Sequence, residues 1–295
     1  MIRKKKNRRF KFFLWGVIIF FSLFVVFILI KDFSRSLFLS NKERINVVFY
    51  GDWTYYFSLD REGEINYYLY FPADLKLTVP GGYGIYRVGG LRKLVSLEKK
   101  PDIFKKTFSL ATSSFVDYYF FPKKIEIYYG FDKKNNLTLP TLAKLINYQS
   151  NANFFDRFYF FFFFLRTPLK NYLALPLVHD EKKIFKEKEF FKKNQGYFYK
   201  KIFPQEDLNI QIVYHQSYQT ALGLSSIMEG EGIKVNDLTK KEKISQKCLI
   251  LENKKKNSGT AIALKNFFHC QIKKRETDLY DIIFILNNEE NNWSY

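Results

Sequence analysis

The sequence predicts an α/β protein in which an N-terminal transmembrane helix precedes a mixed α/β domain and a small C-terminal α/β sandwich. Three observations predict this fold class. Residues 12–30 form an uncharged apolar run, residues 45–77 contain strand-like runs separated by turn signals, and residues 208–288 alternate strands with helices. A chain of 295 residues is long enough for an anchor, one mid-sized domain and a small second domain.

The N-terminal segment has the pattern of a membrane anchor. Residues 1–11 carry the basic cluster RKKKNRR, and at about 1.5 Å per residue the apolar run after it nearly spans a bilayer core of about 30 Å. Positive residues favour the cytoplasmic side, so we expect a single-pass cell-membrane protein with a cytoplasmic N-terminus and an extracytoplasmic bulk. A cleavable signal peptide is the alternative, but the run is long for one and no small-residue cleavage site follows it.

The segment after the anchor predicts a stalk and then a sheet. Residues 31–44 are polar and mixed, as expected of a short stalk. Three aromatic and β-branched runs follow at residues 45–50, 54–59 and 65–77, and each predicts a strand. The connection at residues 60–63 ends in glycine and predicts a hairpin between the second and third strands.

The remainder of the first domain mixes both patterns. Its predicted elements are a helix within residues 87–106 interrupted by Pro101, a helix at 104–114, strands at 116–121 and 125–129, and helices starting at 141 and 158. The last of these is the Phe-rich run 158–165, which is far too short to span a membrane and is typical of a helix buried on several sides.

The C-terminal part has a regular β-α-β-β-α-β order. Its predicted elements are strands at 209–214, 233–238, 248–252, 270–274 and 281–286, with helices at 217–231 and 258–268. Ser258 is the expected N-cap of the second helix. Between the two domains, residues 178–207 predict a charged and aromatic linker region. Within it, residues 182–201 predict a solvated amphipathic helix, with binding to anionic lipid headgroups or wall polymers as the alternative.

The charge of the chain favours some partners over others. The formal net charge is +19, which is typical of proteins that bind nucleic acid, an anionic membrane surface or an anionic polymer. Lys, Asn, Ile, Phe and Tyr are all abundant, so the composition of an AT-rich genome explains the excess equally well. The sequence has neither zinc-finger spacing nor an RNA-recognition aromatic motif, and we expect no nucleic-acid partner.

The two cysteines, Cys248 and Cys270, have no CxxC spacing. Outside the membrane they are able to form a disulfide, but both lie on predicted apolar elements, and we favour two buried thiols.

The order of motifs in the first domain resembles the LytR-CpsA-Psr family of envelope enzymes. A strand ends at Gly51-Asp52, and the strand after the hairpin closes on Pro72-Ala73-Asp74, where that family has Ile-Pro-Arg-Asp. Val79-Pro80-Gly81 follows, where the family has Ile-Pro-Gly. The resemblance implies a diverged LytR-CpsA-Psr-like domain at residues 45–177.

The C-terminal domain, residues 208–288, resembles the LytR C-terminal domain. The residues that fit are Gly223-Leu224, 230–235, 260–264 and 281–286. The Asn-Gly turn of that domain is replaced by His215-Gln216-Ser217. The domain carries no established catalytic residues, and we assign none.

The resemblance implies a candidate site. Family members transfer glycopolymers from a polyprenyl pyrophosphate carrier to the cell wall, with arginines on the pyrophosphate and aspartates on a divalent metal. By position, the implied metal ligands are Asp52 and Asp74, the pyrophosphate ligands Arg87 and Arg157, and the lipid-slot residues Phe160, Phe161 and Phe164. Taken as bare residues, Gly51-Asp52 is typical of a surface turn and Asp156-Arg157 of a solvent-exposed pair.

The chain departs from the family at its arginines. The first site has lost its arginine in Gly51-Asp52-Trp53-Thr54, and Ala73 stands at the second. Tyr148-Gln149-Ser150 replaces the later Tyr-x-Arg. Each bidentate arginine contributes several kcal/mol to transition-state stabilisation, so we expect little transferase activity. We therefore assign no catalytic residue and no cofactor, with Mg²⁺ expected only if the site is active.

Three functions remain. The preferred hypothesis is a catalytically degenerate envelope protein that binds a polyprenyl phosphate lipid or an anionic wall glycopolymer. The second is an active glycopolymer–peptidoglycan phosphotransferase with a rearranged site. The third is a membrane-tethered scaffold that binds other proteins. A lipid-sized tunnel would favour the first two, and metal dependence only the second.

Overall fold

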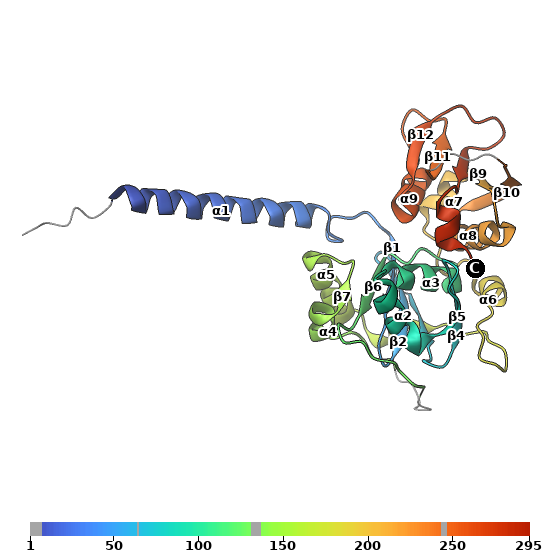
Figure 1. Cartoon of the computed structure of the whole chain (residues 1–295), viewed down its shortest axis with the longest axis horizontal. Coiled ribbons are helices and arrows are strands. Elements are labelled where there is room, and N and C mark those ends of the chain that lie inside the picture. The colour runs from blue at the N-terminus through green and yellow to red at the C-terminus, as the bar shows by residue number, and fades with distance from the viewer. Residues whose placement is uncertain (1–7, 64, 131–136, 243–246) are drawn as a thin grey trace, which may run out of the picture.

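A computed structural model describes residues 8–63, 65–130, 137–242 and 247–295. Figure 1 shows a long N-terminal helix, α1 (Arg8–Ser34), that projects away from two packed α/β domains. Its apolar part, Phe12–Ser34, is long enough to cross a membrane, and none of its most hydrophobic stretch is buried against the rest of the chain. The predicted transmembrane helix therefore matches the structure in length and exposure.

The first domain is built on a six-stranded sheet with the order β7-β6-β1-β2-β3-β8. Its strands are β1 (Arg44–Phe49), β2 (Thr54–Asp60), β3 (Asn66–Phe71), β6 (Tyr118–Phe121), β7 (Gln149–Ser150) and β8 (Tyr172–Ala174). β2 is antiparallel to both β1 and β3, which confirms the predicted hairpin, and β6 is parallel to β1. The strand predicted over residues 65–77 is broken by a turn in which Leu75 N donates to Pro72 O (3.1 Å), because proline cannot supply a ladder donor.

Helices cover both faces of this sheet, so both faces of β1 are buried. The helices are α2 (Leu91–Glu98), α3 (Asp102–Thr112), α4 (Leu142–Asn147), α5 (Phe154–Arg166) and α6 (Glu187–Asn194). Val48 belongs to the core that contains Phe104 of α3, whereas Val47 belongs to the core that contains Phe160 of α5. A small hairpin, β4 (Lys76–Val79) with β5 (Gly84–Arg87), adds Leu77 to the α3 side.

Three predicted segments differ from expectation. Residues 125–129 form no strand, because the Tyr128 N–H bonds to the O atom of Gly89, which lies in a 3₁₀ turn, and not to a strand of the sheet. The expected linker contributes Phe185, Phe190 and Phe198 to the core of the first domain, whereas most of its charged residues remain at the surface. The expected stalk is partly buried, with Ser36 and Leu37 each 1% exposed.

The second domain contains each of the predicted strands and helices, and its full order is β-α-β-β-α-β-β. Its elements are β9 (Asn209–Tyr214), α8 (Tyr218–Gly230), β10 (Lys234–Lys240), β11 (Leu249–Glu252), α9 (Gly259–Phe268), β12 (Gln271–Lys274) and β13 (Ile282–Ile285). They form a sheet with the order β10-β9-β13-β11-β12. Ser258 caps α9 as predicted, by accepting from Ala261 N (3.0 Å). The expectation of two buried thiols was wrong: Cys248 and Cys270 form a disulfide, because adjacent strands β11 and β12 place them side by side.

Two short helices flank this domain and connect it to the first. Residues 204–207, expected as a linker, overlap α7 (Ile202–Glu206), and α10 (Glu289–Trp293) follows β13. The helices α3 and α8 pack closely where a glycine permits it, since a Cβ atom on Gly230 would lie 1.7 Å from Ser113 O. The two domains are therefore in direct contact.

Candidate functional site

The structure places the two candidate metal ligands after strands that end at the same edge of the first sheet. Asp52 follows β1 and Asp74 follows β3, which run in the same direction. Asp52 lines a cavity of about 30 Å³ with Lys144 and Tyr148, which has room for roughly one water molecule. Asp74 instead forms an ion pair with Lys183. Within the described part of the chain, no three His, Cys, Asp or Glu side chains converge as a metal site.

The segment 125–130 closes this edge of the sheet. Tyr128 N donates to Gly89 O (3.0 Å), and Gly89 N donates to Ala73 O (2.8 Å). A Cβ atom on Gly89 would lie 2.0 Å from Tyr128 O, so the chain approaches too closely for any other residue. Tyr50 Oη also donates to Gly89 O (3.0 Å), and burial raises the pKa of Tyr50. The segment 125–130 therefore packs tightly against Gly89 and the turn that contains Ala73.

The candidate arginines lie on opposite faces of the sheet. Arg87 is exposed on β5, on the side of α3. Arg157 lies on the α5 side, 5.6 Å from the centre of the Phe120 ring. Its guanidinium donates to the carbonyls of Leu145, Ile146 (3.3 Å) and Tyr148 (2.9 Å), which holds the C-terminal end of α4. Arg157 therefore has a structural role at a helix end.

The candidate lipid-slot residues divide into two groups. Phe160 and Phe164 are 0% and 4% exposed, whereas Phe161 is partly exposed. The Phe160 ring centre lies 5.3 Å from that of Tyr118 and 5.7 Å from that of Phe120. The rings of Phe160 and Phe164 therefore fill the space between α5 and the sheet.

A larger cleft of about 600 Å³ lies at the opposite end of β1, between the two domains. Its lining comes from the end of the expected stalk, from α3, from the segment before β6, and from α7 and α9. The side chains that carry its chemistry are Asn41, Lys42, Glu43, Asp102, Lys105, Asp117, Asn151, Lys200, Ile202, Phe203, Ile262, Asn266, Phe267 and His269. Lysines and acids are balanced along this lining, so the cleft is close to neutral.

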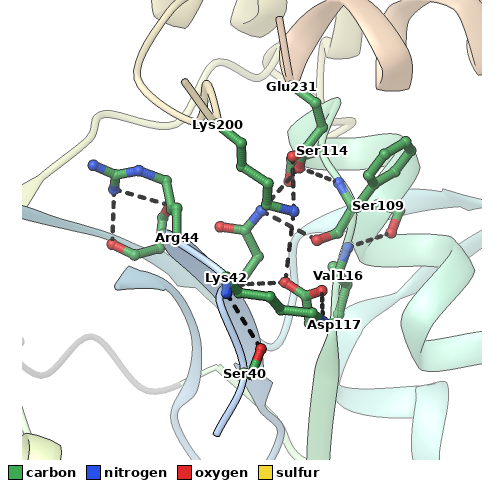
Figure 2. Close-up of polar contacts among 12 residues, drawn as sticks. Ser40, Lys42, Arg44, Ser109, Ser114, Val116, Asp117, Lys200 and Glu231 are labelled. Carbon is green, nitrogen blue, oxygen red and sulfur yellow. Dashed lines mark hydrogen bonds and ion pairs between the residues drawn. The ribbon is translucent and has the colours of Figure 1, made fainter. Parts of the chain in front are cut away.

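The inner wall of the cleft is a buried ionic network, shown in Figure 2. Glu231 closes α8 and reaches into the first domain, where its Oε1 accepts from Phe115 N (2.6 Å) and from Asn46 Nδ2 (3.0 Å). Its other oxygen lies 2.8 Å from Lys200 Nζ. Asp117 pairs with Lys42 at 2.6 Å and lies 3.8 Å from Lys200. Two carboxylates therefore share one buried lysine.

Burial and pairing have opposite effects on these pKa values. Burial raises the pKa of Glu231, and its pair with Lys200 only partly offsets this. Burial also opposes ionisation of Asp117, but Lys200, Lys42 and the Asn46 N–H outweigh it and hold the pKa of Asp117 below its usual value. For Lys200, Asp117 and Glu231 outweigh burial and raise its pKa. Lys200 thus remains charged at neutral pH.

The outer wall of the cleft is apolar. It is lined by Ile262 and Phe267 of α9 and by Ile202 and Phe203 of α7, and these two helices are in contact. Lys105 of α3 donates to Phe267 O (3.1 Å) and lies 4.3 Å from the centre of the Phe267 ring. A cleft with one apolar wall and amides and charges on the other suits a ligand with an apolar face and polar edges. Sequence reasoning missed this site, because its residues come from segments that are far apart along the chain.

The chain is similar to several solved structures. A scan against protein-family models finds no match, and a search of curated proteins finds no significant match. Bacillus subtilis TagT covers 52% of this chain and 88% of its own, with 14% identity and a TM-score of 0.35. A LytR-CPS2A-psr family protein, YwtF (TagT), with bound octaprenyl pyrophosphate lipid covers 51% and 87%, with 13% identity and a TM-score of 0.34. Lin1025 from Listeria innocua covers 52% and 95%, with 11% identity and a TM-score of 0.35. The family that the motifs resemble is thus also found among the solved structures that the chain is similar to.

Proposed function

We propose that this chain is a membrane-anchored cell-envelope protein that binds a polyprenyl-linked or wall glycopolymer without transferring it. The ligand class follows from the motif order of the first domain, and the anchor from the apolar length of α1. The observation that carries the non-catalytic part is that two of the candidate residues bind the chain's own groups, Asp74 the Lys183 side chain and Arg157 backbone carbonyls.

Transfer from a pyrophosphate carrier requires cations that offset the charge that develops on the leaving group. Here the carboxylate of Asp74 is paired with Lys183, and the guanidinium of Arg157 is bound to backbone carbonyls. Ala73, which stands where the family has an arginine, is 7% exposed and contacts Gly89. These contacts favour a binding protein over an active transferase with a rearranged site.

The cleft between the domains is the binding place that we propose. Its volume of about 600 Å³ lies within the range of about 300–1,000 Å³ that is usual for small-ligand sites. Sugar rings have an apolar face and hydroxyl edges, which match the wall of Ile262 and Phe267 and the opposite wall with Asn151.

The test uses the full-length protein in lipid nanodiscs. Binding of a polyprenyl-pyrophosphate-linked glycopolymer is measured with and without Mg²⁺, and transfer to peptidoglycan is measured in the same samples. We expect binding that is independent of Mg²⁺ and unchanged in Asp74→Ala, without transfer. Ile262→Trp should fill the cleft and weaken binding by about tenfold or more. Leu279→Trp is the matched control, because Leu279 is 85% exposed and lies outside the cleft.

Other outcomes would favour the other hypotheses. Metal-dependent binding that is lost in Asp74→Ala, together with transfer, would establish the rearranged transferase. Binding that is equally strong in Ile262→Trp and Leu279→Trp would place the ligand outside the cleft. No binding at all would leave the membrane-tethered scaffold.

A further inference from the structure

The outward face of α5 is almost entirely apolar. The helix buries the stripe of Asp156, Phe160 and Phe164 against the sheet. Its outer positions, spaced three or four residues apart, are Phe154, Phe158, Phe161, Phe162 and Leu165. Phe154, Phe162 and Leu165 are 56%, 41% and 69% exposed, and the other two are partly exposed. A helix on the surface of a soluble domain normally has polar residues on this face.

An exposed apolar patch of this kind indicates a contact surface. Contiguous exposed apolar surface on a folded protein marks a contact with a membrane or a partner. Phe161 packs partly against the core beside the buried stripe, but Phe154, Phe162 and Leu165 remain exposed, so packing of the first domain does not account for these three residues.

The helix α5 lies close to the C-terminal end of α1 (Figure 1) and is in contact with it. The Phe33 ring of α1 meets the Phe155 ring with centres 5.2 Å apart. Asn153 Nδ2 donates to Asp32 O (3.3 Å), and Leu37 N donates to Asp156 Oδ1 (2.8 Å). These contacts hold both ends of the connection, so α5 cannot move far from the base of α1.

We propose that α5 lies on the outer surface of the bilayer, with its outward phenylalanines and Leu165 in the boundary between headgroups and acyl chains. The inference rests on the proposed membrane anchor, because α1 places α5 at the bilayer surface. Two cations lie at the C-terminal end of the patch: Arg166 lies 6.0 Å from the centre of the Phe162 ring, and Lys170 is exposed shortly after the helix. Basic residues beside an apolar helix face favour anionic lipid headgroups.

We infer that lipid, and not another protein, contacts this patch, because the patch adjoins the end of the proposed membrane anchor α1. Phe38 and Leu39, beyond the end of α1, are 40% and 56% exposed. The Phe38 ring lies 5.4 Å from that of Tyr159, so these residues extend the patch from the base of α1 to α5. Phe161, predicted from the sequence to line a lipid slot, would then contact lipid from outside the domain.

The test measures the surroundings of the outer face directly. Phe162→Cys is labelled with an environment-sensitive fluorophore in the full-length protein, in nanodiscs of phosphatidylethanolamine and phosphatidylglycerol. The native cysteines are joined in a disulfide and do not react. Quenching by nitroxide-labelled lipid is compared with quenching by aqueous iodide. Phe21→Cys within α1 reports the anchor, and Leu279→Cys, at a position that is 85% exposed, reports water.

We expect the label at position 162 to be quenched by lipid several-fold more than the label at 279, and less by iodide. Equal iodide quenching at 162 and 279, with lipid quenching at 21, would overturn the inference and leave the anchor intact. Shielding at 162 from both quenchers would also overturn it, in favour of a contact between protein copies. Absence of lipid quenching at 21 would instead contradict the anchor itself.

Discussion

Lys200 is the residue on which the boundary between the domains depends. It balances the carboxylates of Asp117 and Glu231, and the side chain of Glu231 is fully buried. Removing one member of a buried ionic group is strongly destabilising, because it leaves an uncompensated charge out of water. The network therefore stabilises the folded chain only while Lys200 is present.

We predict that Lys200→Met lowers the free energy of unfolding by about 3–5 kcal/mol at pH 7. Burial already raises the pKa of Glu231 above its usual value, and loss of Lys200 removes the main group that opposes this shift, so protonation of Glu231 would favour the folded state of the variant. The loss should therefore be smaller at pH 5 than at pH 7. Denaturant unfolding of the detergent-solubilised protein at both pH values measures the effect.

Lys201→Met is the matched control. The Lys201 side chain is 64% exposed and lies 3.7 Å from Glu62, so its loss should cost about 0–1 kcal/mol. An equal loss in the two variants, or a loss that does not change with pH, would contradict the assigned role of Lys200.

The sequence gives no sign of this network. Asn46 and Glu231 are 185 residues apart, and a buried acid at the end of a helix looks like any exposed one. The candidate site is inferred from motif positions, and such positions do not show which distant residues pair with the site. Asp52 and Asp74 are chosen from the motifs at the ends of two strands, but Lys183, which pairs with Asp74, comes from a segment 109 residues away and could not be anticipated from those motifs.

At the scale of elements, local signals predicted what local chemistry determines. The α9 cap at Ser258 and the strands of the second domain follow from residue type and spacing. Residues 125–129 have a strand pattern but pair with no strand, because Tyr128 N bonds to Gly89 O. The Phe-rich run predicted a helix, but a run that is apolar on every side does not show which face is buried.

The two faces of α5 lead to a direct prediction. Phe160→Ala should lower the free energy of unfolding by about 3–5 kcal/mol, because it opens a cavity in the core. Phe162→Ala changes a side chain that is 41% exposed and should cost less than about 1 kcal/mol in detergent. Equal losses would show that the faces of the helix are assigned the wrong way round. Chemical denaturation followed by far-UV circular dichroism makes the comparison.

At the scale of the whole molecule, hydrogen bonds join the two domains at more than one place. Lys105 and Lys106 of α3 donate to the carbonyls of Phe267 (3.1 Å) and Asn292 (3.3 Å), near the ends of α9 and α10. Ser294 O in turn accepts from the N–H groups of Gly81 (2.7 Å) and Gly82. The sequence predicted two domains with a linker, but it could not show that the linker's aromatic residues are buried in the first core.

We therefore predict that both domains unfold in one transition. Gly230→Ala, whose Cβ would clash with Ser113 O, should lower the midpoint for both domains together by several degrees. With Trp15 replaced by Phe throughout, the fluorescence of Trp53 in a Trp293→Phe background and of Trp293 in a Trp53→Phe background reports each domain separately. Gly90→Ala is the control, because a Cβ there meets nothing within 4 Å. Separate midpoints for the two tryptophans would contradict the coupling.

The buried connection after α1 limits how far the two domains can move relative to the proposed membrane anchor. A flexible tether would let the domains swing and search a wide volume of the envelope. Here the Leu37 N–H is hydrogen-bonded to Asp156 and Leu37 is buried, so the connection between the proposed anchor and the domains is rigid. The height of the interdomain cleft above the bilayer is then set by the fold itself. A ligand must come to that height, so chains growing from lipid carriers in the same leaflet are better placed to meet the cleft than polymers deep in the wall.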